Sequence, residues 1–156
     1  MSASGPADLP VLIRRGEAGD AVALEGLIRQ LGYNEAAQDI AARLGALDPQ
    51  RQFVLVAERG GQVIGCLTTS IMHVLHRPRP VGRISMMVVD ESLRGQRIGE
   101  RLVRHAESEL ADLGCGLVEV TSNLRLAEAH RFYERLGYSR TSIRFARELS
   151  APAACP

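Results

Sequence analysis

Hydrophobic residues follow two spacings along this chain, and each change of spacing marks the border of a predicted element. Short apolar, β-branched runs between turn residues predict strands at 11–14, 53–58, 63–72, 81–89, 117–121 and 138–149. Apolar residues that recur every three or four positions predict helices at 21–31, 36–47, 96–113 and 126–136. The buried stripe predicted for the third helix consists of Ile98, Leu102, Val103, Ala106 and Leu110.

The connections between these elements predict how the strands pair. Arg59-Gly60-Gly61-Gln62 is typical of a tight turn, so we expect 53–58 and 63–72 to form a hairpin. Strand 81–89, the helix that follows it and strand 117–121 form one crossover unit, which requires those two strands to be parallel. The sheet is thus predicted to be mixed and mostly antiparallel, and the fold class is α/β (α+β).

Composition restricts the class of protein more than it identifies a function. The 156 residues fit one domain, 1–156, with 1–9 and 150–156 predicted as flexible tails. A net charge of +1 gives no general attraction to nucleic acid or to a membrane surface, and no apolar run is long enough to span a bilayer. Three widely spaced cysteines fit neither a disulfide framework nor a zinc site, so we expect no metal and a cytoplasmic, reducing location.

The stretch from Ile84 to Gly99 carries the main candidate chemistry. An apolar strand ends at Asp90-Glu91-Ser92, and a basic turn, Arg94-Gly95-Gln96-Arg97-Ile98-Gly99, leads into a helix. The first N–H groups of a helix lack partners and its dipole favours negative charge, so this arrangement provides a site for phosphate. By itself the turn is equally compatible with an ordinary surface connection. It lacks the spacing of a P-loop or of a dinucleotide-binding loop.

This turn resembles the coenzyme A loop of the GNAT superfamily of N-acetyltransferases, whose pattern is Gln/Arg-x-x-Gly-x-Gly/Ala after a strand. Arg94 and Gly99 match the first and last positions, whereas Arg97 stands where the family most often has glycine. An arginine there is compatible with a backbone N–H contact if its dihedrals are helical. The order of predicted elements also matches the GNAT order over nearly the whole chain.

A second stretch, from Ala129 to Tyr138, resembles the family signature Ala-x-x-x-Tyr-x-x-x-Gly-Phe/Tyr. It matches at Ala129, Tyr133, Gly137 and Tyr138. In the family, the tyrosine at the position of Tyr133 lies near the coenzyme sulfur and often protonates the leaving thiolate, which suits a phenol that is protonated at neutral pH. The alternative for Tyr133 is a helix tyrosine packed on the sheet.

The resemblance implies a GNAT fold, which is a central sheet of six to seven strands with a splayed parallel pair, flanked by four helices. It implies that acetyl-CoA is the co-substrate and binds where that pair opens, beside a bulged strand whose N–H near Val88 polarises the thioester carbonyl. The residues assigned to coenzyme binding are Met87, Val88, Val89, Arg94, Gly95, Gln96, Arg97, Ile98, Gly99, Glu100 and Asn123. The family usually carries an asparagine seven residues before the tyrosine, where this chain has Leu126, so Asn123 or the neighbouring Ser122 is expected to hold the coenzyme arm instead.

The base that accepts the proton of the amine has several candidates. Glu119 matches a position on the fifth strand that serves as base in some relatives, and a carboxylate can take the proton directly or through water. His73 and His76 lie in a loop of the kind where acceptors often bind, so they are alternatives. Glu119 is also compatible with a structural role as a strand glutamate paired with an arginine.

The resemblance assigns acceptor selection to the first two helices and the loop between them. Tyr33 is a candidate wall for a small amine, Glu35 a candidate attractor of its charge, and His73 a third contact. The implied activity is acetyl transfer to a small-molecule amine. The alternatives are transfer to a protein N-terminus or lysine, and a non-catalytic acyl-CoA sensor. Relatives often dimerise through the final strands, so 143–149 is a candidate homodimer surface.

Overall fold

The structure, a computed structural model, describes residues 9–150. It divides into two compact units, with the border between Thr121 and Ser122. The tails predicted at 1–9 and 150–156 lie outside the described residues, except for Leu9 and Ser150.

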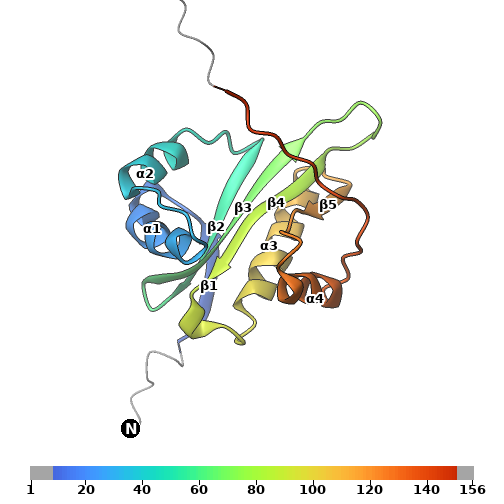
Figure 1. Ribbon diagram of the computed structural model, residues 1–156. Helices are drawn as coiled ribbons and strands as arrows, with labels where there is room; N and C mark the ends of the chain where they lie inside the picture. Colours follow the sequence, from blue (N-terminus) through green and yellow to red (C-terminus); the bar gives the residue numbers. More distant parts are fainter. Residues whose placement is uncertain (1–8, 151–156) are drawn as a thin grey trace, which may run out of the picture. The chain divides into compact units, whose positions relative to one another are not determined.

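The first unit is built on one five-stranded sheet, in which the strands lie side by side in chain order (Figure 1). The strands are β1 (Val11–Arg15), β2 (Gln52–Arg59), β3 (Gln62–Met72), β4 (Val81–Val89) and β5 (Leu117–Val120). The helices are α1 (Ala21–Gln30) and α2 (Ala37–Gly45) on one face of the sheet and α3 (Ile98–Asp112) on the other. Single 3₁₀ turns, η2 (Ala18–Asp20) and η3 (Glu91–Leu93), precede α1 and α3.

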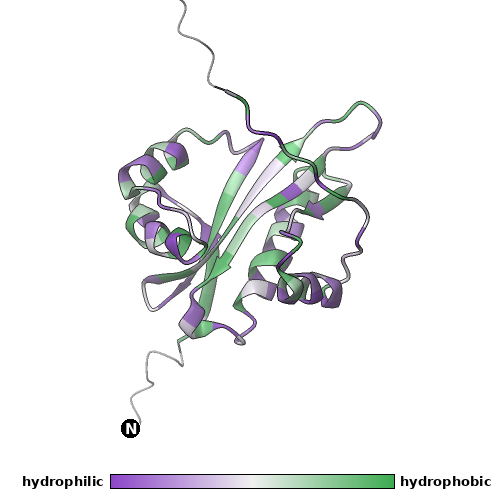
Figure 2. Ribbon diagram, viewed as in Figure 1, coloured by the Kyte–Doolittle hydropathy of each residue, from purple (hydrophilic) through white to green (hydrophobic). Residues whose placement is uncertain are grey.

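Apolar stripes on the helices cover both faces of this sheet. Under α1 and α2, the buried cluster consists of Ala21, Leu24, Leu27, Ile40, Val56, Cys66 and Val88. On the other face, α3 buries the predicted stripe of Ile98, Leu102, Val103, Ala106 and Leu110. Figure 2 shows the same division, with hydrophobic residues along the central strands and hydrophilic residues on the outer sides of the helices.

The predicted hairpin and the predicted parallel pair are both confirmed. β2 and β3 pair antiparallel as far as Arg59 and Gln62, and Gly60 and Gly61 form the two-residue turn between them. Both glycines have positive φ angles, 58° and 80°, which the turn that suits a twisted hairpin requires. β4 and β5 are parallel, and α3 makes the crossover between them.

β4 contains a bulge, and β5 ends just before the level of the bulge. Thr69 pairs with Ile84 whereas Thr68 pairs with Met86, so Ser85 is the extra residue in β4. β5 pairs with β4 only as far as Ile84, which leaves the rest of β4 without a neighbour in β5. The bulge lies directly after the last pair, Ile84 with Val120, and residues 85–89 form the unpaired half of β4 on this side. The splay of the two strands stays a prediction.

The second unit contains α4 (Ala127–Arg135), whose last turn is closed by the residues of the second motif. The N–H of Gly137 donates to the carbonyl oxygen of Glu134, and the N–H of Tyr138 donates to that of Tyr133, both at 3.0 Å. This Schellman motif needs a left-handed residue, and Gly137 has a φ of 97°. The spacing from tyrosine to glycine to tyrosine in the motif is thus the spacing of a helix stop.

Two predictions about the sheet are wrong. It has five strands rather than six to seven, because residues 138–150 form no strand. Alternating apolar residues show that a segment can present an apolar face, but a strand forms only where a neighbouring edge takes its backbone hydrogen bonds. Ile143, Phe145 and Leu149 are exposed instead. Dimerisation through 143–149 stays a prediction.

The four predicted helices are present, with bounds that differ by one or two residues at most ends. α2 ends at Gly45 and α3 begins at Ile98. Asp20 precedes α1, but its carboxylate pairs with Arg14 and accepts the N–H of Glu17 instead of capping α1. None of the helices within residues 9–150 has both the length and the apolar character that crossing a membrane requires.

Candidate active site

The turn between β4 and α3 is exposed and is held at both ends by hydrogen bonds. At its start, Asp90 Oδ1 accepts the N–H of Ser92 at 2.9 Å. At its end, Gln96 Oε1 accepts from Arg59 Nη1 at 2.9 Å. Arg94 lies between these points, is exposed, and forms no ion pair with any residue that the structure describes. Its guanidinium is therefore available to a ligand.

Arg97 is the N-cap of α3 and has φ 60° and ψ 18°. This corrects the expectation of helical dihedrals, because these angles belong to the left-handed region. No other non-glycine residue between 9 and 150 has a positive φ, and this conformation costs an L-residue about 1–2 kcal/mol. The side chain turns toward α3, where Nε donates to Glu100 Oε2 at 2.9 Å. Glycine adopts such angles without this cost, which fits the preference of the family for glycine at this position.

α3 begins with backbone donors that have no acceptor in the described part of the chain. The first bond of the helix runs from the N–H of Arg101 to the carbonyl oxygen of Arg97, at 3.1 Å. No oxygen within residues 9–150 accepts from the N–H of Ile98, Gly99 or Glu100. Together with the dipole of α3, these donors provide a site for a phosphate group.

Arg59 belongs to this region, although it lies in neither of the two motifs. It ends β2 and lies 37 positions before its partner Gln96. Its Nε atom is buried and has no partner among the described residues. Only the folded sheet brings β2 to this turn, so no local pattern in the sequence indicates the contact.

The unpaired half of β4, residues 85–89, presents backbone donors on the side away from β3. The N–H of Asp90 donates to the carbonyl oxygen of Ile64 in β3 at 2.9 Å. Because N–H groups point to alternate sides along a strand, that of Val88 also points toward β3, and those of Met87 and Val89 point the other way. The donor expected near the thioester therefore moves from Val88 to Met87 or Val89.

Glu119 lies where β4 and β5 part, and it forms an ion pair with Arg83. Its Oε1 accepts from Arg83 Nε at 2.7 Å and lies 2.5 Å from Nη2. Its Oε2 has no partner within residues 9–150. The arginine pairing that the sequence analysis kept open is therefore present, and one carboxylate oxygen remains free to accept a proton.

Tyr133, in the second unit, is a partly buried residue of α4 that packs against other aromatic rings. Its ring meets those of Phe132 and Tyr138 edge to face, with centroids 5.1 and 5.7 Å apart. Burial raises the pKa of Tyr133 to about 12. The phenol is therefore a proton donor, not an acceptor, throughout the neutral range.

Asn123, in the same unit, uses most of its polar atoms to shape the connection before α4. Its side-chain oxygen accepts the N–H of Arg125 at 3.0 Å, and its carbonyl oxygen accepts the N–H of Leu126 at 3.0 Å. The carbonyl oxygen also lies 2.9 Å from His130 Nε2. The contact of Asn123 with the coenzyme arm stays a prediction, and the side-chain NH₂ group is the part of Asn123 that can make it.

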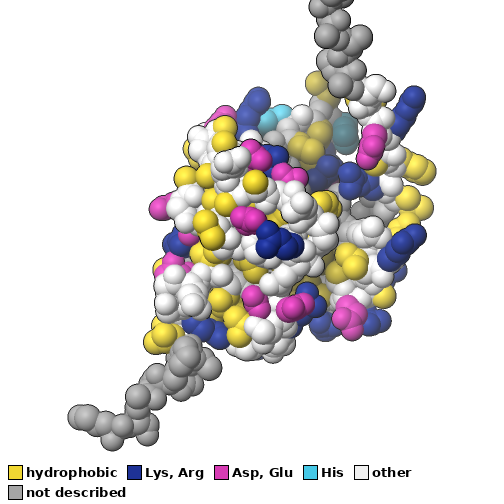
Figure 3. Space-filling model, turned by 60° about the vertical axis from the view of Figure 1, so that its left-hand side comes forward, with side chains coloured by type: hydrophobic (Ala, Val, Ile, Leu, Met, Phe, Trp, Pro, Cys, Tyr) yellow, Lys and Arg dark blue, Asp and Glu magenta, His cyan; other side chains and the backbone are white. Residues whose placement is uncertain are grey.

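The two acceptor residues predicted after α1 lie on the surface of the first unit. Tyr33 is exposed. Glu35 forms an ion pair with Arg43 of α2, with Oε2 and Nη1 2.6 Å apart. The carboxylate is therefore already paired, and attraction of an amine by Glu35 requires competition with Arg43. Figure 3 shows charges of both signs interspersed over this side of the molecule.

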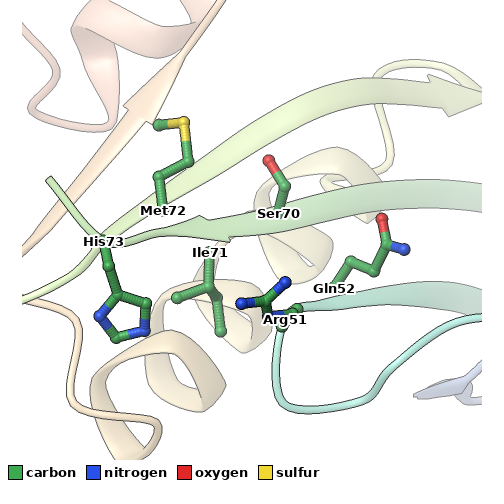
Figure 4. A pocket seen from close by; sticks show the side chains of 6 residues that line it. All are labelled: Arg51, Gln52, Ser70, Ile71, Met72 and His73. Atoms are coloured by element: carbon green, nitrogen blue, oxygen red, sulfur yellow. The ribbon is translucent and has the colours of Figure 1, made fainter.

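His73 follows the end of β3, beside a hollow of about 500 Å³. The hollow is lined by Arg51, Gln52, Ser70, Ile71, Met72 and His73. Figure 4 shows His73 and Ile71 on one side of β3, and Ser70 and Met72 on the other. His73 thus does not share a side of the strand with Ser70, the neighbour of Arg83 in the sheet. Its part in acceptor binding stays a prediction.

Comparison with known proteins identifies the family. The sequence model of the Acetyltransferase (GNAT) family matches residues 23–138. The chain belongs to the GNAT family. The resemblance inferred from the two motifs is thereby confirmed, and the protein is an acyltransferase of the N-acetyltransferase type, from a family that uses acetyl-CoA. This GNAT protein is 36% identical over 129 residues to the aminoalkylphosphonate N-acetyltransferase of Salmonella typhimurium, which covers 83% of this chain and 82% of the relative.

Solved structures of other acetyltransferases share the fold of this GNAT protein. A putative acetyltransferase from Agrobacterium tumefaciens has a TM-score of 0.79 and 26% identity, covering 88% of this chain and 99% of that one. The glucosamine-6-phosphate N-acetyltransferase of Arabidopsis thaliana has a TM-score of 0.78 and 21% identity, covering 90% and 99%. At that low identity the second likeness shows the fold alone.

Proposed function

We propose that this GNAT protein transfers the acetyl group of acetyl-CoA to the amine of a small molecule. The observation that carries the proposal is the position of Glu119, which offers a free carboxylate oxygen where β4 and β5 part. The relative at 36% identity supports a small amine, because its name describes an acceptor of that kind.

The coenzyme is proposed to bind along the turn and the unpaired half of β4, residues 85–89. Arg94 and the free N–H groups at the start of α3 bind the diphosphate, because these are the charged and oriented donors that phosphate prefers. The N–H of Met87 or Val89 donates to the thioester oxygen, where negative charge develops during the reaction. The other assigned contacts, from Gly95 to Glu100 and at Asn123, shape or line the path of the coenzyme.

The transfer is proposed to proceed by direct attack. The amine nitrogen forms a bond to the thioester carbonyl carbon, and the carbon–sulfur bond breaks. Glu119 accepts the proton that the nitrogen loses, through Oε2 or a water molecule. Tyr133 gives its phenolic proton to the departing thiolate, which produces free coenzyme A. Tyr33, Glu35 and His73 are proposed to contact the acceptor.

An amine screen with mass detection tests this proposal. The purified protein is incubated with acetyl-CoA and, in separate reactions, aminoalkylphosphonates, amino sugars, diamines and lysine-containing peptides. The chain contains no lysine, so acetylation of its own side-chain amines does not obscure the signal. We expect an N-acetylated small molecule and an equal amount of free coenzyme A. Product from peptides alone, or from no amine at all, would contradict the proposal.

The variant Glu119→Gln distinguishes a role of Glu119 as the base from a role in coenzyme binding. The amide keeps the shape of the side chain and cannot accept the proton, so we expect kcat to fall by roughly 10²–10⁴-fold. The affinity for acetyl-CoA, measured by calorimetry, should stay within about twofold of the wild type. A variant that keeps its full rate would remove Glu119 as the base and favour a histidine or water.

Location and assembly complete the proposal. We infer a cytoplasmic enzyme, since Cys66 and Cys115 are free thiols and reducing compartments preserve that state.

Homodimer formation is proposed through 143–149, where Ile143, Phe145 and Leu149 are exposed. Light scattering across a range of protein concentrations measures the oligomeric state, and a monomer at all concentrations contradicts the dimer.

A further inference from the structure

A row of polar side chains crosses four strands at one level of the sheet. Gln52 in β2 pairs with Ser70 in β3, Ser70 pairs with Arg83 in β4, and Arg83 pairs with Glu119 in β5. Directly paired residues point to the same face of a sheet, so the four side chains form one continuous row. The row ends at Glu119, where β4 and β5 part.

The charged members of this row can be reached from solvent and are only partly used. The side chains of Arg83 and Glu119 are each 37% exposed. Arg83 contributes Nε and Nη2 to the pair, and Glu119 contributes only Oε1. Within residues 9–150, Arg83 Nη1 and Glu119 Oε2 have no partner. The row therefore offers one unused group of each sign, one strand apart.

This arrangement favours amines that also carry a negatively charged group over amines that do not. A simple ammonium that approaches Glu119 competes with Arg83 for the same carboxylate. A molecule that also carries an acid group gives Arg83 a new partner, so that one ion pair is replaced by two. Neighbouring strands lie about 4.8 Å apart, a distance that two or three linking carbon atoms span.

We propose, on the basis of the proposed function, that the acceptor is an amine carrying an acid group, which Arg83 binds with Ser70 and Gln52 beside it while Glu119 faces the amine. Phosphonate, phosphate and carboxylate share the oxygen geometry that a guanidinium binds through two hydrogen bonds. The feature that Arg83 recognises is the acid group, and the experiment decides whether that group is a phosphonate, a phosphate or a carboxylate.

Matched acceptors and one charge-removing variant test the proposal. Rates are measured with 2-aminoethylphosphonate, phosphoethanolamine, β-alanine and the acid-free ethanolamine. For the wild type, we expect kcat/KM to be about tenfold or more higher for at least one acid-bearing amine than for ethanolamine. Arg83→Gln should lose this preference, mainly through a higher KM for the acid-bearing amines. Arg104→Gln, which removes a charge from an ion pair on α3, is the matched control and should keep the preference.

Two further measurements distinguish acid recognition by Arg83 from a purely structural role of Arg83. Arg83→Lys retains the charge and should recover part of the preference, which a purely structural role for Arg83 does not predict. Calorimetric binding of 2-aminoethylphosphonate with coenzyme A present tests the site without turnover, and Arg83→Gln should weaken it about tenfold or more. Equal binding to the wild type and to a folded Arg83→Gln, or equal losses for all four amines, overturns the proposal and leaves acetyl transfer itself intact. Failure of every amine as acceptor contradicts the proposed function instead.

Discussion

Tyr133 and Tyr138 are joined both through their backbones and through their rings. The N–H of Tyr138 donates to the carbonyl oxygen of Tyr133 at 3.0 Å, and the ring centroids lie 5.7 Å apart at an interplanar angle of 70°. The stop of α4 therefore fixes the backbone that carries the proposed acid. The spacing of the family signature thus has a structural cause as well as a proposed catalytic one.

Replacing Tyr133 by phenylalanine tests its role as the acid. We expect kcat to fall roughly ten- to a thousandfold, while the affinity for acetyl-CoA changes little, because only the proton donor is lost. With a pKa near 12, Tyr133 stays protonated between about pH 6 and 10, so it should not produce an alkaline limb in the wild-type rate profile. Tyr138→Phe keeps the ring contact and the helix stop, and it is the matched control. A full rate in Tyr133→Phe would exclude the phenol as acid.

Replacing Arg94 by alanine tests the phosphate site. Loss of a charge-assisted hydrogen bond should weaken coenzyme A binding by about 1–3 kcal/mol, measured by calorimetry at low salt. S-acetylpantetheine, which lacks the diphosphate, should bind the variant and the wild type equally. Arg104→Ala removes a similar charge from the surface of α3 and should have no effect. Unchanged coenzyme affinity in Arg94→Ala would contradict the phosphate assignment.

Arg97 offers a test of backbone strain. Its φ of 60° is unfavourable for an L-residue, and glycine removes that cost while adding some freedom to the unfolded chain. We expect Arg97→Gly to raise the free energy of unfolding in urea by up to about 1 kcal/mol. Arg97→Ala also removes the pair with Glu100 but keeps the strain, so it should not stabilise. If both variants gain the same stability, the side chain rather than the backbone is the cause.

Asp20 should make the stability of the first unit depend on acid. Hydrogen bonds from Arg14 hold the pKa of this carboxyl below its usual value of 3.8, so the folded state binds the proton less readily than the unfolded state. The contribution of Asp20 to folding stability is therefore complete above its pKa in the unfolded chain. It is lost as the pH falls through its lower pKa in the folded protein.

The measurement is urea unfolding of the wild type and of Asp20→Asn across pH. At pH 7 the variant should be less stable by about 1–3 kcal/mol, and the difference should shrink below about pH 4. Asp112→Asn, at the end of α3, is the control because no ion pair of Asp112 exists among the described residues. A difference that stays constant down to about pH 2 would mean that the Asp20 charge contributes no stability.

Local patterns in the sequence determined a large part of the fold. The apolar stripe of α3 and the Gly60-Gly61 hairpin follow from rules that act within a few residues, because helix periodicity and turn conformation are short-range properties. The two motifs are also short-range features. They identify the turn before α3 and the helix stop after Tyr133, each of which is built from neighbouring residues.

Tertiary structure alone decided which groups meet. Glu119 and Arg83 lie 36 positions apart, and the register between β4 and β5 makes them partners. β5 ends opposite Ile84, so the N–H groups of Met87 and Val89, which point away from β3, have no partner in β5. Periodicity shows which face of an element is buried, but the edge that pairs with it depends on the whole sheet, which is also why the alternation in 138–149 did not produce a strand.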